Sequence, residues 1–227
     1  MESYSSEINS DKNQLDMSLS RSEIVKSLKN DRDFFDHKCS RLKKLFLVPF
    51  FNHINACLDD IKSSGKVKNS IDIWCGKWCI TEYIQTYTDI TWLWIDISEN
   101  KIRFAKHMYP HMRFEKTDCE DIVSLWKTFD LLICTEVLEH QEHPEKLLSL
   151  FDKISDKYIL LSVPHEPYRS RSNLMRGKYI SRWGTTPDHK QKYTKSSFQK
   201  TLNDTLPWRE INVQSKWFRL IAIAKKL

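Results

Sequence analysis

Acidic side chains recur in this 227-residue chain at the ends of short apolar runs, where an open α/β sheet carries its chemistry. Asp72, Asp96, Asp118 and Glu136 each lie in or directly after such a run. Because ligands of these sheets bind outside the carboxyl ends of the strands, the four carboxylates are predicted to line one crevice. Asp96 follows Gly76 by 20 positions, the spacing at which nucleotide-binding folds place a carboxylate for the ribose hydroxyls.

The turn after Asp72 is the most unusual feature of the chain. A strand-to-helix turn beneath a nucleoside needs residues without a Cβ, because its backbone takes positive φ and approaches the ligand closely. Here Trp74 and Trp78 occupy two such positions around Cys75 and Gly76. The backbone of Trp74, Cys75 and Gly76 is nevertheless predicted to face the bound molecule.

Strands and helices are predicted to alternate around these residues. The strands are expected at 70–75, 91–96, 112–116, 129–134 and 157–163, and the helices at 78–87, 99–109, 120–126 and 143–154. An irregular basic stretch at 164–193, a helix near 195–203 and strands near 208–214 and 216–224 should follow. This alternation predicts a three-layer α/β sandwich with a mostly parallel, seven-stranded, Rossmann-like sheet whose last strand is antiparallel.

Three regions are predicted along the chain. Residues 1–20 are polar and are expected to form a disordered tail. Residues 21–65 repeat apolar side chains at threes and fours, which indicates a helical cap, and 66–227 should form the main domain. No apolar run approaches 18 residues and no secretory signal is apparent, so no transmembrane segment is expected.

The motifs resemble those of class I methyltransferases that use S-adenosylmethionine. The first motif of that family, acid-x-Gly-x-Gly-x-Gly, is represented by Asp72-Ile73-Trp74-Cys75-Gly76-Lys77-Trp78, which keeps the acid and the middle glycine. The second, Gly-x-Asp-x-Ser, corresponds to Trp94-Ile95-Asp96-Ile97-Ser98. The fourth is matched most closely, by Thr135-Glu136-Val137-Leu138-Glu139-His140. The resemblance covers about residues 34–224 and implies methyl transfer to an oxygen or nitrogen of an acceptor.

This resemblance implies a role for each residue of the crevice. The cofactor would contact Asp72, Trp74, Cys75, Gly76, Asp96, Ile97, Asp118, Cys119, Thr135 and Glu136. Asp96 would accept both ribose hydroxyls, Ile97 would lie against the adenine, and Asp118 would meet the adenine amino group. His140 has a suitable intrinsic pKa to act as general base. The alternatives are structural: Asp96 and Asp118 could serve the next helix start, and His140 could only support its loop.

Tryptophan stands at all three glycine positions that these motifs lack. An ordinary chain of this length would have roughly 16 glycines at about 7%, whereas this one has 4 Gly and 8 Trp. We hypothesise that the source reads UGA as glycine and that Trp74, Trp78 and Trp94 result from translation with another code. The alternative is a degenerate family member that has lost cofactor binding and serves as a binding module.

Charge is concentrated in the last third of the chain. Residues 165–227 hold 14 Lys or Arg against 4 Asp or Glu, a net +10, while the whole chain carries +6. This basic region favours an anionic acceptor such as a phosphate-bearing sugar lipid, with nucleic acid the less favoured partner, and a merely solvated basic face is the alternative. Tyr168, Tyr179, Trp183 and Tyr193 interleave with its cations and could stack bases or sugars, or could be core residues of an ordered lid. The oligomeric state is not indicated.

No metal site is predicted from the cysteines at positions 39, 57, 75, 79, 119 and 134, which show no C-x-x-C pair and are expected to be free thiols of a cytoplasmic protein. An alternative metal site would use Glu136, Glu139 and His140, which lie together if that segment is helical, with His189. That set resembles the small-RNA 3′-end 2′-O-methyltransferases. The segments 162–167 and 176–189 are closer to bacterial small-molecule and sugar-lipid methyltransferases, which favours the first interpretation.

Overall fold

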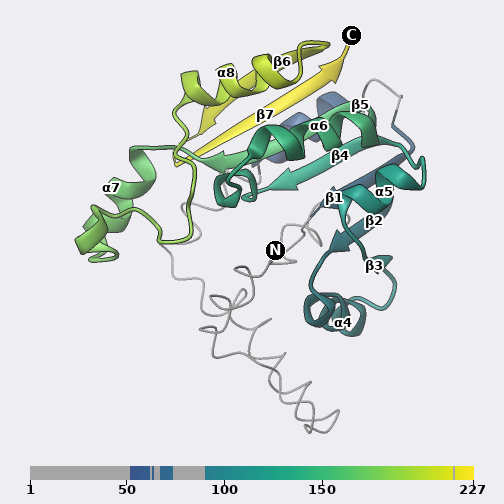
Figure 1. The fold of residues 1–227 in the computed structure, drawn as a ribbon, viewed down its shortest axis with the longest axis horizontal. Coiled ribbons are helices and arrows are strands. Elements are labelled where there is room, and N and C mark those ends of the chain that lie inside the picture. Colours follow the sequence, from purple (N-terminus) through teal and green to yellow (C-terminus); the bar gives the residue numbers. More distant parts are fainter. Residues whose placement is uncertain (1–51, 62, 64–66, 74–89, 217) are drawn as a thin grey trace, which may run out of the picture. The chain divides into compact units, whose positions relative to one another are not determined.

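The computed structural model describes residues 52–61, 63, 67–73, 90–216 and 218–227, all within one compact unit that spans 46–227. The described strands form a single seven-stranded sheet in the order β3-β2-β1-β4-β5-β7-β6 (Figure 1). Their bounds are β1 (Asn69–Ile73), β2 (Thr91–Asp96), β3 (Phe114–Lys116), β4 (Phe129–Thr135), β5 (Ser155–Pro164), β6 (Arg209–Lys216) and β7 (Arg219–Lys226). Among the described strands, β7 alone runs opposite to the others, so the predicted sheet is confirmed.

The strand order reverses at β1. This strand pairs with β2 on one side, where Ile71 is opposite Leu93, and with β4 on the other, where Ile71 is opposite Leu132. In open α/β sheets, the point where the strand order reverses is where ligands bind, outside the carboxyl ends of the strands. The fold thus places the ends of β2, β1 and β4 side by side.

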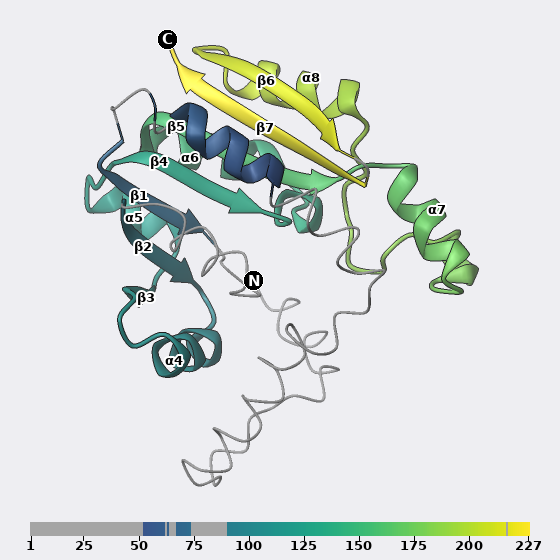
Figure 2. The ribbon, with the colours of Figure 1, turned by 180° about the vertical axis from the view of Figure 1, so that it is seen from behind.

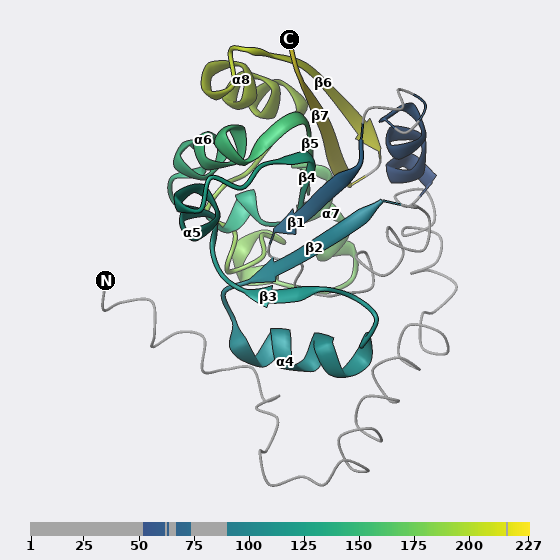
Figure 3. The same ribbon diagram turned by 90° about the vertical axis from the view of Figure 1, so that its right-hand side faces the viewer.

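Helices cover both faces of the sheet. They are α4 (Glu99–Met108), α5 (Cys119–Ser124), α6 (Pro144–Ile154), α7 (Tyr168–Met175) and α8 (Lys195–Thr205), with 3-10 turns η2 (Leu138–His140) and η3 (Ile180–Arg182). Figure 3 shows α5, α6 and α8 on one face and the helix at 52–61 on the other. The apolar residues of α4 join those of the helix at 52–61.

Two apolar cores hold these layers together. Because both faces of the sheet are covered, the central strands are continuously apolar, and the side chains of Leu131 to Cys134 are all buried. One core joins the sheet to α5, α6 and α8. The other contains Trp92 and Trp94, whose rings stack with centroids 5.0 Å apart. Trp94 is therefore part of the packing on the second face.

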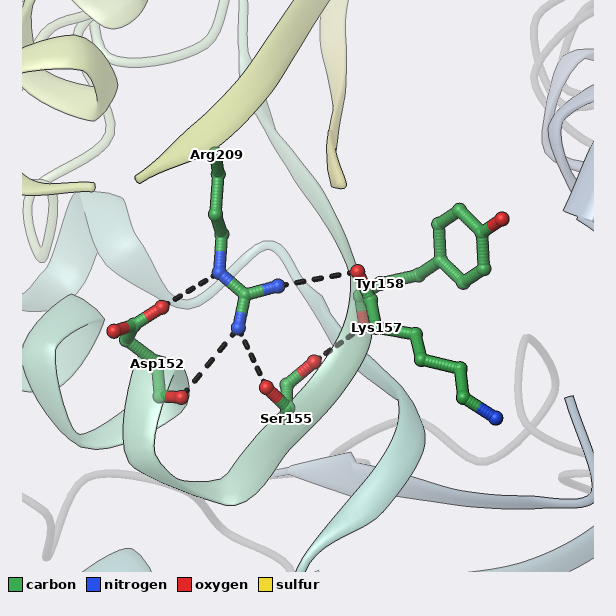
Figure 4. Close-up of polar contacts among 5 residues, drawn as sticks. All are labelled: Asp152, Ser155, Lys157, Tyr158 and Arg209. Carbon is green, nitrogen blue, oxygen red and sulfur yellow. Dashed lines mark hydrogen bonds and ion pairs between the residues drawn. The ribbon is translucent and has the colours of Figure 1, made fainter. Parts of the chain in front are cut away.

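A buried arginine fixes the closing hairpin to the rest of the sheet (Figure 4). The Arg209 side chain, which has no exposed surface, donates from Nε to Oδ1 of Asp152 at 2.6 Å. Its Nη2 donates to the carbonyl oxygen of Ser155 at 2.6 Å, and Nη1 donates to that of Lys157 at 3.2 Å. One side chain therefore connects β6 to the end of α6 and the start of β5.

The prediction that residues 164–193 are irregular is wrong, because α7 and η3 lie within them. The sequence of α7, YRSRSNLM, has too few apolar residues to show a helical period, so the pattern could not reveal it. Figure 2 shows α7 standing away from the sheet. The helix is instead bonded to the segment that follows η3, where Nδ2 of Asn173 donates to the carbonyl oxygen of Gly184 at 2.8 Å.

Several predictions fall wholly or largely outside the described residues: the tail at 1–20, most of the cap at 21–65 and the helix at 78–87. Cys57, Cys119 and Cys134 are buried free thiols, as predicted, while the other three cysteines are outside that part of the chain. Burial raises the pKa of Cys57 to about 11. Among the described helices, none combines the length and apolar character that crossing a bilayer requires.

Candidate functional site

The predicted carboxylates meet at the carboxyl ends of adjacent strands. Asp72 lies near the end of β1, Asp96 ends β2, and Thr135 ends β4, directly before Glu136. Since β1 lies between β2 and β4, these residues border one edge of the sheet. Trp74, Cys75 and Gly76 follow β1 in sequence but lie outside the described residues.

Asp96 serves the start of the next helix, which is one of the two roles that the sequence left open. Its carboxylate Oδ1 accepts the backbone N–H of Ser98 at 2.8 Å, and Ser98 is the N-cap of α4. The other oxygen lies 3.5 Å from Nζ of Lys101. Each carboxylate oxygen has two acceptor positions, so Asp96 keeps capacity for two further donors. Ile97 beside it is 56% exposed and offers apolar surface to a planar ring.

Asp118 and Cys119 start α5. The Asp118 carboxylate accepts the backbone N–H of Asp121 at 2.8 Å, so the alternative N-cap role is observed. This bond uses Oδ1 and leaves the second oxygen for another donor. The Cys119 thiol points into the core, and its burial raises its pKa to about 12. Only the backbone of Cys119 is therefore suited to meet a ligand.

Glu136 turns the chain sharply at the end of β4. Its φ of 57° is in the left-handed region, which costs a non-glycine residue on the order of 1 kcal/mol. The Glu136 carboxylate accepts from Ser162 Oγ at 3.3 Å and lies 3.4 Å from Nε of Arg219. The condition that Glu136, Glu139 and His140 share a helix is not met, since only η2 is helical and Glu136 precedes it. Because the backbone at Glu136 is left-handed directly after β4, the spacing of three and four residues does not place these side chains on one helix face.

Glu139, His140 and His189 do come together. One ligand atom of each lies within 4.8 Å of the others, and Glu136 is not part of this group. The backbone oxygen of Glu139 accepts the N–H groups of Lys190 and Gln191 at 2.7 and 2.9 Å, which holds the segment 188–191 against η2. Burial raises the pKa of Glu139 to about 9, and the charge of Glu136 adds to the effect. This environment therefore favours the protonated form of the Glu139 side chain.

His140 is oriented by Asp188. Its Nδ1 lies 3.1 Å from the backbone oxygen of Asp188 and 3.3 Å from the Asp188 carboxylate. Because a carbonyl oxygen only accepts, Nδ1 must carry the proton and Nε2 is left as an acceptor. The nearest carboxylate oxygen to Nε2, Oε1 of Glu139, is 3.7 Å away, too far for a hydrogen bond. His140 thus presents a basic nitrogen within the cluster.

His189 and Arg169 lie close to His140 and Glu136. The rings of His189 and His140 meet edge to face with centroids 5.1 Å apart. Burial, and then the nearby His140, lowers the pKa of His189. Arg169, in the first turn of α7, also has a lowered pKa because of burial, although the charge of Glu136 opposes the shift.

The sequence did not single out Arg169, Arg219 or Asp188 as site residues. Arg169 is one of many cations in the basic region, Arg219 begins β7 without a motif, and Asp188 carries no motif apart from its neighbour His189. These three residues come from segments far from the motif strands, and only the folded chain brings them to Glu136 and His140.

Comparison with known proteins places these features in context. A family model described as a methyltransferase domain matches residues 51–205. No curated protein matches the chain. A solved magnesium protoporphyrin IX methyltransferase from Synechocystis PCC 6803 with bound SAH is 17% identical, with 89% of this chain and 95% of that chain covered and a TM-score of 0.61.

Two other solved structures show the same likeness. The plantazolicin methyltransferase, in complex with a triazolic desmethylPZN analog and SAH, is 16% identical, with coverage of 90% of this chain and 97% of that chain and a TM-score of 0.64. A SAM-dependent methyltransferase from Archaeoglobus fulgidus is 19% identical, with 78% and 94% covered and a TM-score of 0.56. At these identities the likeness shows a shared fold.

Proposed function

This chain belongs to the methyltransferase domain family, and we propose that it transfers the methyl group of S-adenosylmethionine to an oxygen or nitrogen of an anionic acceptor. The predicted class I fold and the methyltransferase family are confirmed by the family match and by the fold shared with solved methyltransferases. The roles of individual residues and the nature of the acceptor are the proposal.

Cofactor binding is proposed at the ends of β1, β2 and β4. The observation that carries this is the buried carboxylate of Asp96, which keeps acceptor capacity for two hydroxyls next to the exposed side chain of Ile97. The second carboxylate oxygen of Asp118 would accept a hydrogen bond from the adenine amino group. Asp72, Thr135 and Glu136 would border the methionine end together with the turn at 74–76.

His140 is proposed as the general base. When bound, the cofactor supplies an electrophilic methyl group on a sulfonium, so the protein mainly has to align the acceptor and remove its proton. An acceptor hydroxyl would form its new bond to the methyl carbon as the carbon–sulfur bond breaks, and its proton would pass to Nε2 of His140. Asp188 favours this step because it keeps the proton on Nδ1 and stabilises the imidazolium that forms.

An anionic acceptor is supported by the cations around the cluster. Arg219 lies beside Glu136, and the lowered pKa of Arg169, due to its burial, indicates a guanidinium that has lost much of its water. A phosphate or carboxylate would pair with such a guanidinium in place of that water. The excess of basic residues after position 165 supports the same interpretation.

Titration of S-adenosylhomocysteine into the full chain tests the cofactor site. We expect weak or absent binding for the chain as written and restored binding for Trp74→Gly/Trp78→Gly, because both indoles stand where the turn needs glycine. Trp94 is kept, since its fully buried ring packs on Trp92 and its removal would leave a cavity. Absence of binding in both proteins would instead support the non-catalytic binding module.

The base is tested in the cofactor-binding variant. With a panel of phosphorylated acceptors and their dephosphorylated counterparts, S-adenosylhomocysteine release should depend on the phosphate. His140→Asn should lower kcat by about 10²–10⁴-fold without changing cofactor affinity. Equal turnover in His140→Asn would remove His140 from the mechanism, and equal turnover of the two acceptor sets would remove the anionic acceptor.

A metal-dependent function is a second candidate because Glu139, His140 and His189 converge. A carboxylate with two imidazoles suits a divalent transition ion, and the Oε2 atom of Glu139 has no hydrogen-bond partner in the described part of the chain. The ion would act as a Lewis acid on an acceptor hydroxyl, as in the RNA 2′-O-methyltransferase interpretation. If a metal ion is required, both a chelator and His189→Ala should abolish turnover. If His140 acts as the base without a metal ion, most of the turnover should remain after either treatment.

A further inference from the structure

Residues 168–187, which we call the arm, form an excursion from the sheet that contains α7 and η3 (Figures 1 and 2). The two ends of the excursion meet at its base, where His165 and Tyr193 form a parallel bridge. There the backbone N–H of Glu166 donates to the carbonyl oxygen of Tyr193 at 2.8 Å. The arm therefore starts and ends beside the segment that holds His189.

Polar and backbone contacts hold the arm in shape. Asn173, which is 3% exposed, donates to the carbonyl oxygen of Gly184 at 2.8 Å and accepts from Nη2 of Arg176 at 2.7 Å. Gly184 has a φ of 75°, and a Cβ at this position would lie 2.0 Å from the backbone oxygen of Ser170. A glycine is therefore required for α7 and the return segment to pack closely. The hydrogen bonds of Asn173 use none of the exposed apolar side chains of the arm.

Those apolar side chains face solvent. Of the ten large exposed apolar residues in the described part of the chain, five lie in the arm: Tyr168, Met175, Tyr179, Ile180 and Trp183. Met175 is 89% and Ile180 68% exposed. Exposed apolar side chains gathered on one segment are typical of a surface that contacts a partner.

The charge of the arm defines the chemistry of that partner. The arm contains five cations and no Asp or Glu. Arg169 is partly buried near Glu136, and the four exposed cations are Arg171, Arg176, Lys178 and Arg182. A second copy of the arm would be repelled by this charge, whereas an anionic surface would be attracted. The partner must therefore offer negative charge and accept aliphatic side chains at the same place.

A lipid bilayer meets both conditions. Single-stranded nucleic acid would use the cations and stack bases on the aromatic rings, but it offers no environment for Met175 and Ile180. At a bilayer surface, aliphatic side chains enter the acyl region, Tyr and Trp lie at the interface, and Lys and Arg meet anionic headgroups. We propose that the arm docks this protein on membranes rich in anionic phospholipid.

Docking would bring the site close to the lipid. The segment 188–191, which follows the arm directly, is bonded to the backbone of Glu139 and carries Asp188 and His189. An acceptor carried by a lipid would then reach His140 from the membrane surface. This last step rests on the proposed function, whereas membrane binding stands on the arm alone and needs neither cofactor nor acceptor.

Vesicle flotation of the full chain tests the proposal without any methyl acceptor. The wild type should float with vesicles of equal parts phosphatidylglycerol and phosphatidylcholine, should stay behind with pure phosphatidylcholine, and should dissociate at high salt. Met175→Ser/Ile180→Ser and Lys178→Glu/Arg182→Glu should each weaken binding by about tenfold or more. These positions are exposed, so the fold should be unaffected, and neither pair includes Trp183.

Matched changes outside the arm serve as controls. Leu125→Ser/Leu227→Ser removes two exposed aliphatic side chains, and Lys127→Glu/Lys146→Glu reverses two exposed cations. Both should bind vesicles like the wild type. The proposal is overturned if the wild type does not float, if the control pairs weaken binding as much as the arm pairs, or if the wild type shifts a single-stranded RNA probe but ignores anionic vesicles. A failure of methyl transfer alone leaves these results unchanged.

Discussion

Trp126→Gly is predicted to stabilise this protein, against the usual effect of removing a large side chain. Trp126 follows α5 with a φ of 54° and is 92% exposed. Its N–H donates to the carbonyl oxygen of Val123 at 3.0 Å, and that of Lys127 donates to the carbonyl oxygen of Ile122 at 3.4 Å. These two bonds define a Schellman motif, in which the residue at the Trp126 position is usually glycine.

The magnitude follows from two opposing effects. A side chain in the left-handed region costs roughly 1–2 kcal/mol, and glycine removes this strain. Glycine also makes the unfolded chain more flexible, which costs roughly 0.5–1 kcal/mol. Because the indole is almost fully exposed, its removal sacrifices little packing. The net expectation is a gain of about 0.5–1 kcal/mol, which corresponds to a Tm increase of about 2 °C for a protein of this size.

The chain contains its own reference for this measurement. Gly177 stands at the same position after α7, with a φ of 67°, and the same pair of bonds reaches the carbonyl oxygens of Leu174 and Asn173. A Cβ at Gly177 would touch nothing within 4 Å, so Gly177→Ala should lower Tm through backbone strain alone. Trp208, 70% exposed and without positive φ, is the control, and Trp208→Gly should lower Tm. A fall in Tm for Trp126→Gly like that for Trp208→Gly would refute the reasoning.

Three further predictions concern single residues. In the Trp74→Gly/Trp78→Gly background, Asp96→Asn should weaken S-adenosylhomocysteine binding roughly 30- to 100-fold in a calorimetric titration, because a charged acceptor is lost, while Asp121→Asn should not. Burial alone would raise the pKa of Asp130, but the hydrogen bond and charge of Lys157 and the backbone N–H groups of Lys68 and Asn69 lower it. The ionised Asp130 therefore stabilises the fold above its unfolded pKa near 3.8, and this stabilisation is lost as pH falls through the lower folded pKa. In thermal melts, Asp130→Asn should have a lower Tm than the wild type at pH 7. In strong acid the two proteins should have the same Tm. Arg209→Met should lower the free energy of unfolding, measured by denaturant titration, by about 3–5 kcal/mol because it leaves a carboxylate and buried carbonyl groups unpaired. Lys200→Met, which breaks an exposed ion pair with Asp204, should lower it by less than about 0.5 kcal/mol.

The sheet and its acids were predictable because both depend on local patterns. Buried parallel strands are continuous apolar runs, and the residue after each run lies at the functional edge, so Asp96 and Glu136 could be placed from sequence alone. The pairing of His140 with Asp188 was not predictable, because it joins segments 48 residues apart through a loop without periodicity. Helix α7 was missed for a related reason, since its stability comes from Asn173 and Gly184 rather than from an apolar face.

The tryptophans divide by environment. Trp126 and Trp183 adopt left-handed backbone conformations on the surface, where glycine is the favoured residue. Trp92 and Trp94 are buried and stacked on each other, where an indole fills space that glycine would leave empty. The reassigned-code hypothesis therefore predicts UGA codons at positions 126 and 183, as at 74 and 78, and a UGG codon at position 92.

Trp94 is the position where motif and packing disagree. The second motif places glycine there, whereas the structure uses its ring to contact Trp92 and Phe114. A UGA codon at 94 would mean that glycine stands in the natural core and that Trp92 and Phe114 pack differently around it. UGG codons at 74, 78 and 126 would end the hypothesis, because each of these positions then carries an encoded indole that the cofactor turn and the Schellman motif have to tolerate. Sequencing the gene separates these outcomes before any protein is made.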